Sequence, residues 1–503
     1  MSSRGVRYAA AALSGLLQVL CFPRFSILYL APIALVPLLL AVVAARDARE
    51  RFLLGWVSGM AFWGGACYWI YDVMHGYAGL AGPAAAAIFT AFFIAKGLHS
   101  AAFAALSGPL LKRPWALPAV AALWVAIEGT HQYLGFTWLL LGNAGVSMAA
   151  LARLAPFTGV HGLSFLFVMM NVAVALLIWR RPRRESAALL VLPLLFLLPA
   201  LPEGEEGDRV VRLVQPNVHP DEMIRGWTAE RGRQHLERML ELSTRQAEQI
   251  DPAPAELLIW PEYSVPAYYF DSEVSREFME QVARESGAHF IFNTMAFEDT
   301  HDGRRPLNSA VTLDPQGRFI SRYAKIFRVP FGEFVPWPFS AFVDKITLAA
   351  GDFLPGEDVA VAQLGEHGVG TFICYESVFA RGVRLFVAGG AEVLVNISND
   401  SWYGRSAARH QHLLIARMRA IENGRYLIRA TNDGITTVIN RAGQITAPLP
   451  SFEQGVIVSR YAYSDKLTWF ARFGEWFWYV SLLAAAAFLF LGRRDIIESA
   501  GRD

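Results

Sequence analysis

Long apolar runs separated by short polar stretches fill the first 201 residues of the chain. A helix needs about 20 consecutive apolar residues to cross a bilayer. The pattern predicts seven such helices, near residues 8–22, 26–44, 53–73, 83–111, 115–133, 159–179 and 187–201, and an eighth near 473–491. It therefore predicts a multi-span membrane bundle of about eight helices, interrupted by one long polar interval.

The polar interval follows a different pattern. Short apolar and β-branched runs at 210–214, 257–260, 289–293, 370–374 and 393–397 predict buried strands, and residues 230–250 and 275–286 predict helices between them. Strands that alternate with helices indicate an α/β layer fold. The predicted organisation is a membrane domain at 1–207, an α/β domain at 208–465, and a last membrane helix with a short tail at 466–503.

Basic residues indicate the orientation, because short cytoplasmic loops are enriched in Lys and Arg. They gather in alternate connections between the apolar runs: Arg4, Arg7, Arg46, Arg49, Arg51, Lys112, Arg113, Arg180, Arg181, Arg183, Arg184, Arg493 and Arg494. Both termini are therefore predicted to be cytoplasmic and the interval 208–465 to be periplasmic, in a bacterial inner membrane. The first run has the charge pattern of a signal peptide, but we interpret it as a retained helix because several spans follow it.

Composition supports a membrane protein and excludes some partners. Of 503 residues, 54% are hydrophobic and only 18% are charged, which is too apolar for an ordinary soluble protein. The formal net charge of +1, without a basic patch, argues against a nucleic-acid partner. No group of His, Cys and carboxylate residues has the spacing of a metal site, so neither a metal nor another cofactor is predicted.

Three polar residues stand where predicted strands end. Glu262 follows the run 257–260, and Lys325 lies in the segment 322–333, with Glu333 eight residues after it. Cys374 ends the run 370–374, whereas Cys21 and Cys67 lie in membrane runs and argue against a disulfide framework. A thiol exposed at a strand-to-helix elbow can act as a nucleophile.

Each of these residues also has a structural interpretation. An isolated Glu is commonly a solvated loop charge, a strand lysine is commonly a surface charge that extends to water, and a lone buried Cys commonly packs as an inert thiol. The chemical interpretation is a general base at Glu262, a cation at Lys325 that stabilises an oxyanion, and a nucleophile at Cys374.

The three residues together carry a family resemblance. Glu, Lys and Cys, each after an apolar strand and in this chain order, resemble the nitrilase superfamily, and the resemblance extends to the segment 396–404. It implies a four-layer αββα sandwich for residues 208–465. Joined to a multi-span membrane domain, the triad resembles the apolipoprotein N-acyltransferase family, with support from the segments 135–142, 214–217 and 331–336.

The resemblance implies roles for individual residues. Cys374 would be the nucleophile, Glu262 the base and Lys325 the oxyanion partner. The supporting active-site residues would be Glu333, Tyr375 through its backbone N–H, and Glu376. The candidates for substrate binding would be Trp227, Trp402 and Asn308, although the two tryptophans are also explained by packing at a domain surface.

The implied reaction is a two-step acyl exchange. A phospholipid, typically phosphatidylethanolamine, would give its acyl group to Cys374 as a thioester. The α-amino group of the diacylglyceryl cysteine of an apolipoprotein would then take it. Two other hypotheses remain: a membrane-anchored amidase that hydrolyses a small amide, and a transporter or sensor whose outer domain only binds a ligand.

Overall fold

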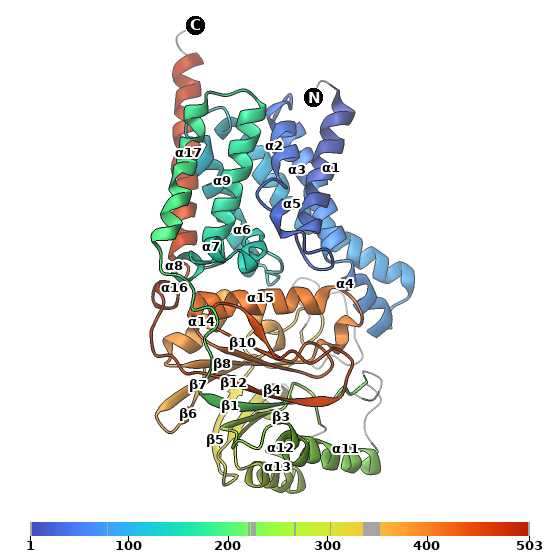
Figure 1. The fold of residues 1–503 in the computed structure, drawn as a ribbon. Coiled ribbons are helices and arrows are strands. Elements are labelled where there is room, and N and C mark those ends of the chain that lie inside the picture. The colour runs from blue at the N-terminus through green and yellow to red at the C-terminus, as the bar shows by residue number, and fades with distance from the viewer. Residues whose placement is uncertain are drawn as a thin grey trace. The chain divides into compact units, whose positions relative to one another are not determined.

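The chain folds into two compact units, shown in Figure 1 as a computed structural model that describes residues 3–500 except 78, 220–221, 223–227, 266–267, 302 and 335–352. The first unit comprises Met1–Asp72, Ala81–Leu201 and Phe473–Asp503. The second comprises Val73–Leu80 and Pro202–Arg472, so a short segment between two helices of the first unit clusters with the second.

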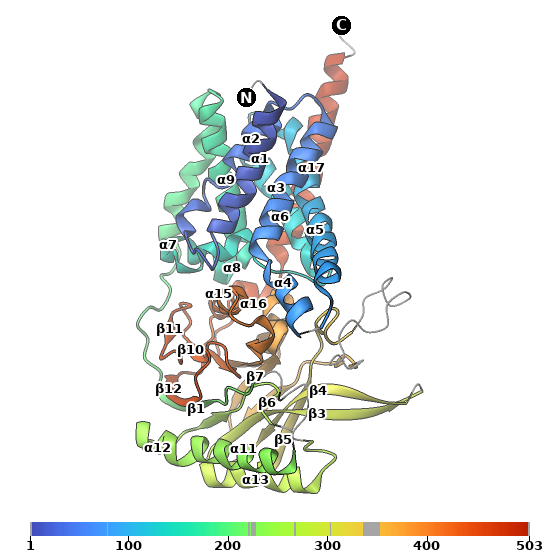
Figure 2. The same ribbon diagram turned by 90° about the vertical axis from the view of Figure 1, so that its right-hand side faces the viewer.

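The first unit is helical (Figure 2). Its α-helices are α1 (Arg4–Leu20), α2 (Val36–Val43), α3 (Ala48–Ala66), α4 (Trp69–Asp72), α5 (Gly82–Leu110), α6 (Ala116–Glu128), α7 (Ala149–Ala152), α8 (Ala155–Thr158), α9 (Val160–Ile178) and α17 (Trp476–Ala500). Among the described residues, α5 and α9 are long and apolar enough to cross a membrane, and a shorter apolar stretch covers Trp476–Gly492.

Two predicted spans differ from the structure. In the predicted span 26–44, the α-helix is confined to the eight residues of α2. The predicted span 187–201 is replaced by a 3-10 helix over Arg183–Leu197. Prolines account for both differences, because a proline lacks the N–H that an α-helix interior requires: Pro32 precedes α2, Pro37 lies in its first turn, and Pro193 lies inside the 3-10 helix.

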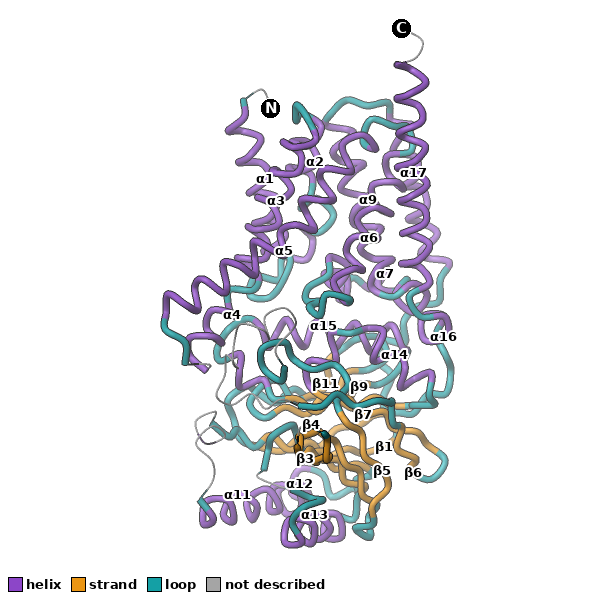
Figure 3. Tube along the Cα trace, turned by 180° about the vertical axis from the view of Figure 1, so that it is seen from behind, coloured by secondary structure: helices purple, strands orange, loops and turns teal. Residues whose placement is uncertain are grey.

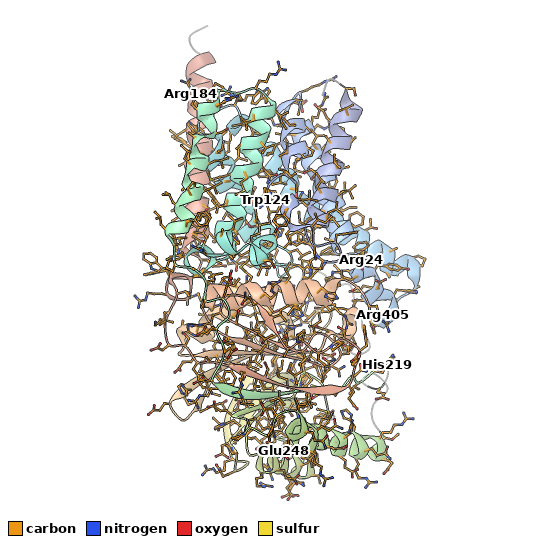
Figure 4. The ribbon with its side chains drawn as sticks, viewed as in Figure 1. Arg24, Trp124, Arg184, His219, Glu248 and Arg405 are labelled. Atoms are coloured by element: carbon orange, nitrogen blue, oxygen red, sulfur yellow. The ribbon has the colours of Figure 1, made fainter. Side chains whose placement is uncertain are left out.

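The first unit buries a carboxylate at the end of α6. Glu128 is buried, and its Oε1 atom accepts hydrogen bonds from the backbone N–H of Leu141 at 2.8 Å and from the indole Nε1 of Trp124 at 3.1 Å. Trp124 lies among the helices of this unit (Figure 4). Glu128 thus ties the chain after α6 to the end of that helix.

The second unit contains two six-stranded sheets. The first has the order β12-β1-β2-β3-β4-β5 and the second the order β11-β10-β9-β8-β7-β6. The strands are β1 (Arg209–Gln215), β2 (Leu257–Ile259), β3 (His289–Thr300), β4 (Gly303–Leu313), β5 (Phe319–Ala324), β6 (Val361–Leu364), β7 (His367–Ile373), β8 (Val393–Ser398), β9 (Leu427–Thr431), β10 (Thr437–Ile439), β11 (Ile445–Thr446) and β12 (Gly455–Tyr461).

Helices cover the outer faces of the two sheets, which gives four layers (Figures 1 and 3). The helices α11 (Ala229–Glu241), α12 (Ala247–Ile250) and α13 (Glu273–Ser286) lie beside the first sheet. The helices α14 (Ala380–Ala388) and α15 (Ala408–Asn423) cover the second, and α16 (Trp469–Phe473) follows β12. The αββα sandwich expected from the nitrilase resemblance is therefore present.

Local sequence explains the elements that position the site. Every residue of β8 is buried, as expected for a strand with parallel neighbours on both sides and covered faces. Helix α13 begins with a side-chain cap from Ser272 and ends at Gly287 in the left-handed conformation that favours glycine. Its Met279 packs with Trp260 and Phe290 in the core beneath the first sheet.

Candidate active site

Three strand ends bring Glu262, Lys325 and Cys374 together. Glu262 lies in the turn after β2, Lys325 immediately follows β5, and Cys374 immediately follows β7. Their exposed fractions are 2%, 2% and 6%. Because Glu262 and Lys325 are this deeply buried, they are not solvated surface charges.

The two charged residues are held in a hydrogen-bonded group. Lys325 Nζ lies 3.4 Å from Glu262 Oε1 and 2.8 Å from Glu333 Oε1. The Asn308 side-chain amide, on β4, donates to the same oxygens at 2.8 and 3.1 Å, and the backbone N–H of Asn399 donates to Glu262 Oε2 at 3.0 Å. A buried charge is tolerated when it is paired and hydrogen-bonded in this way.

Cys374 adopts an unusual backbone conformation beside this group. Its φ of 53° lies in the left-handed region, which a residue with a side chain adopts only when its surroundings impose it. The thiol lies close enough to the Glu262 carboxylate for each group to shift the pKa of the other. The turn after β7 therefore holds the sulfur beside a carboxylate that can accept its proton.

The surroundings shift the proton affinities of all three groups. Burial raises the pKa of the Cys374 thiol, Glu262 raises it further, and Lys325 opposes both effects. Burial also raises the pKa of Glu262, against the Lys325 cation. Burial lowers the pKa of Lys325, but the carboxylates of Glu333 and Glu262 outweigh it, so that pKa is raised overall. The result is a neutral thiol next to a carboxyl group made more basic by its environment.

Glu376 braces the turn that carries Cys374. One of its oxygens accepts from the backbone N–H of Ile373 at 2.8 Å. The other accepts from the backbone N–H groups of Ile326 and Phe327, at 2.8 and 3.0 Å, and from the Tyr323 hydroxyl at 2.7 Å. Glu376 thus ties the segment after β7 to the segment that begins with Lys325.

The remaining predicted site residues are placed as follows. Tyr375 is buried, with its ring against Phe379. Trp402 is half-buried and meets the ring of Tyr77 edge to face, at 6.1 Å between centroids. Trp227 lies outside the described residues. Within the described part of the chain, no cluster of three or more His, Cys, Asp and Glu side chains is arranged to hold a metal ion.

Further residues that the sequence does not predict contact the site from β3, β9, α15 and the turn after β8. Asn293 donates to the Asn308 side-chain oxygen at 2.7 Å, and a buried group formed by Asp400, His412 and Arg429 lies on the far side of Cys374. The sequence gives a signal only for Asp400, which lies in the segment 396–404. His412 and Arg429 lie within a helix and a strand, where nothing in the local pattern distinguishes them from ordinary polar residues.

A fold of this kind with Glu, Lys and Cys at its strand ends defines a carbon-nitrogen hydrolase domain, and that family matches residues 210–464. The apolipoprotein N-acyltransferase N-terminal domain family matches residues 14–173. The chain belongs to the apolipoprotein N-acyltransferase family.

Relatives support this assignment over almost the whole length. The apolipoprotein N-acyltransferase of Geobacter metallireducens is 34% identical, with 95% of this chain and 94% of the relative covered. That of Nitrosomonas europaea is 31% identical, with 98% and 99% covered. Among solved structures, an amidase of the nitrilase superfamily from Nesterenkonia is 21% identical, with a TM-score of 0.38 over 52% of this chain and 92% of the amidase.

Proposed function

We propose that this chain is a phospholipid-dependent N-acyltransferase that completes lipoprotein maturation through a thioester on Cys374. The observation that carries the proposal is the buried ion pair of Glu262 and Lys325 at two strand ends, close enough to Cys374 at a third to shift the pKa of its thiol. The acyl donor is phosphatidylethanolamine. The acceptor is the α-amino group of the diacylglyceryl cysteine at the N-terminus of an apolipoprotein.

In the first half-reaction, Glu262 takes the thiol proton while the Cys374 sulfur attacks the ester carbonyl of the lipid. The developing oxyanion is stabilised by the Lys325 ammonium and the backbone N–H of Tyr375. The carbon–oxygen bond of the ester breaks, the proton passes from Glu262 to the departing oxygen, and a lysophospholipid leaves. A thioester remains on Cys374.

In the second half-reaction, the lipoprotein amine attacks the thioester carbonyl. Glu262 takes a proton from the attacking nitrogen, the carbon–sulfur bond breaks, and the proton returns to sulfur. An amide and the original thiol result. Glu333 holds Lys325, Glu376 holds the turn, and Asn308, whose amide is directed at the two carboxylates, orients Glu262.

The membrane arrangement of this proposal rests on the sequence pattern. Residues 1–207 form a membrane domain, 208–465 the catalytic domain, and 466–503 the last span and tail. About eight spans place both termini in the cytoplasm and the catalytic domain in the periplasm. The apolar helices α5 and α9 support this reading, as does the gathering of arginines in alternate loops. A membrane setting suits the reaction, because extracting an acyl chain from a bilayer costs about 0.8 kcal/mol per CH₂.

The test is mass spectrometry of the purified full chain after incubation with phosphatidylethanolamine, with Cys374→Ala as the control. We expect a fatty-acyl adduct on the Cys374 peptide of the native chain alone, which disappears when a diacylated lipopeptide is added and reappears as an amide on that peptide. If the native chain is folded but forms no adduct, the proposal is refuted. An adduct that is lost to water and never reaches the amine favours a hydrolase.

A further inference from the structure

Three buried polar residues lie behind the proposed nucleophile and outside the Glu-Lys-Cys group. Asp400 follows β8, His412 lies on α15, and Arg429 lies on β9. None of the three has measurable exposure to solvent. Burying charges is unfavourable unless each one is fully paired, so such a group in the core calls for an explanation.

The three side chains contact one another. Arg429 Nη2 lies 2.8 and 3.0 Å from the two carboxylate oxygens of Asp400 and 3.0 Å from His412 Nδ1. His412 Nδ1 lies 3.1 Å from Asp400 Oδ1. Burial lowers the pKa of His412, and Arg429 lowers it further, so the ring is neutral. His412 Nδ1 therefore lies between a donor, Arg429, and an acceptor, Asp400.

The Nε2 side of the His412 ring is directed at the peptide of Cys374. Nε2 lies 3.2 Å from the carbonyl oxygen of Cys374 and 2.7 Å from the Ser377 hydroxyl. The Asn396 side-chain amide donates to the same carbonyl at 3.4 Å, and its oxygen accepts from Arg429. His412 and Asn396 therefore both contact the Cys374 carbonyl, and Arg429 contacts each of them.

A second path leads from the same group to the sulfur. The Ser398 hydroxyl at the end of β8 donates to Asp400 Oδ1 at 3.1 Å and lies close enough to the Cys374 thiol to lower its pKa. Arg429 and Asp400 thus orient contacts to both the backbone and the side chain of Cys374. This matters because the left-handed φ of Cys374 is unfavourable unless neighbouring groups impose it.

We propose that Asp400, His412 and Arg429 form a positioning network that holds the Cys374 peptide in its left-handed conformation, so that the sulfur stays aligned with Glu262 and Lys325. The inference rests on Cys374 being the nucleophile of the proposed function. His412 touches no substrate and is a positioning residue. Its contribution is the Nε2–H bond to the Cys374 carbonyl.

Substitutions of His412 by Gln, Asn and Leu distinguish a hydrogen bond to the Cys374 carbonyl from simple filling of space. In His412→Gln the amide nitrogen stands close to where Nε2 stood and can still donate to the Cys374 carbonyl. In His412→Asn the shorter side chain reaches only the former position of Nδ1. His412→Leu fills the space without any polar contact. His410→Leu, on the exposed side of the same helix, is the matched control.

The first readout is the rate at which iodoacetamide alkylates Cys374 in the full chain, followed by mass spectrometry. The sulfur displaces iodide and no lipid is needed, so the assay stands even when the proposed acyl transfer does not occur. We expect His412→Leu and His412→Asn to be about 10- to 100-fold slower than the native chain, as small misplacements of reacting groups typically are. His412→Gln should recover most of the rate, and His410→Leu should keep all of it.

The second readout is the split between kcat and KM for acyl transfer from phosphatidylethanolamine. A positioning role predicts a lower kcat with KM unchanged within about twofold. Native rates in His412→Asn overturn the inference, and so does a Gln variant as slow as the Asn variant when both melt like the native chain. If His412→Leu does not fold, the Gln and Asn variants alone decide. If native Cys374 is alkylated but never acylated, the proposed function is refuted. The positioning inference is then tested by the alkylation rates of the variants alone.

Discussion

At the scale of single residues, the proton acceptor of the site sets a pH dependence. Burial raises the pKa of Glu262, so the group stays protonated to a higher pH than an ordinary carboxyl. Only its carboxylate can take the Cys374 proton, and Lys325 remains a cation because its pKa is raised. The rate of thioester formation should therefore fall as the pH drops through the raised pKa of Glu262. Single-turnover acylation measured across pH by mass spectrometry tests this expectation.

The control for this pH profile is Glu262→Gln. The amide keeps the shape of the side chain but cannot accept the proton, and loss of a general base slows a reaction by about 10²- to 10⁴-fold. The slow residual rate should no longer level off above the pKa of Glu262, because it then follows only the small thiolate fraction of Cys374, which rises steadily with pH. A native profile whose acidic limb lies at or below the range of an ordinary carboxyl would contradict the assignment of Glu262 as a base in an apolar setting.

At the scale of elements, the Glu376 contacts join β5 to the turn after β7. In Tyr323→Phe the buried carboxylate loses one donor at 2.7 Å. We expect the free energy of unfolding to fall by about 1–2 kcal/mol, and the alkylation of Cys374 to slow because the turn loses support. Thermal unfolding in detergent measures the first effect. The exposed Tyr268→Phe serves as control, and equal melting of the two variants would mean that this bond stabilises nothing.

A second element-scale prediction concerns the segment that follows α6. In Glu128→Gln the side-chain carbonyl can still accept from the Leu141 N–H, whereas Glu128→Leu leaves that buried donor without its partner. An unsatisfied buried donor costs about 1–3 kcal/mol. The Leu variant should therefore melt lower than the Gln variant in detergent, by tryptophan fluorescence. A Leu variant as stable as the native chain would show that Glu128 is not needed to fix this segment.

The sequence predicts which apolar runs form strands and helices. It predicts the ends and interruptions of these elements less well. The apolar runs at 257–260, 370–374 and 393–397 correspond to β2, the end of β7 with Cys374, and β8. The predicted helix 230–250 is interrupted, because Leu242–Gln246 forms a π-helical turn between α11 and α12. Hydropathy also gives no weight to prolines. Prolines limit the length of α2, and the α-helix expected at 187–201 is a 3-10 helix with a proline inside it.

The sequence predicts those residues of the candidate site that lie at the end of a single strand. Glu262 and Cys374 follow the buried strands β2 and β7, whereas Lys325 follows β5, most of whose residues are exposed or half-buried. Asp400, His412 and Arg429 come together only because β8, α15 and β9 are adjacent in the folded unit. No local period encodes that adjacency, so a buried polar group assembled from three elements needs the structure.

At the scale of the whole molecule, the distribution of arginines makes a prediction about sidedness. Arg184 lies in the first turn of the 3-10 helix, in a group of four arginines at 180, 181, 183 and 184, and the proposal puts it in the cytoplasm because basic residues are enriched there. Glu248 lies on α12 of the sheet-containing unit, which the proposal puts in the periplasm. Both side chains are exposed, and the three native cysteines are buried, so an introduced thiol at either position gives a distinct signal.

We expect Glu248→Cys, made in the Cys374→Ala chain, to react with a membrane-impermeant maleimide on intact bacterial spheroplasts. Arg184→Cys should react only after the membrane is permeabilised. Detergent-solubilised samples in which both thiols react establish that each position is accessible. If Arg184→Cys is labelled from outside and Glu248→Cys is not, the catalytic unit faces the cytoplasm. It would then be separated from substrates in the outer leaflet, and the proposed acceptor would have to be abandoned even if Cys374 forms a thioester in vitro.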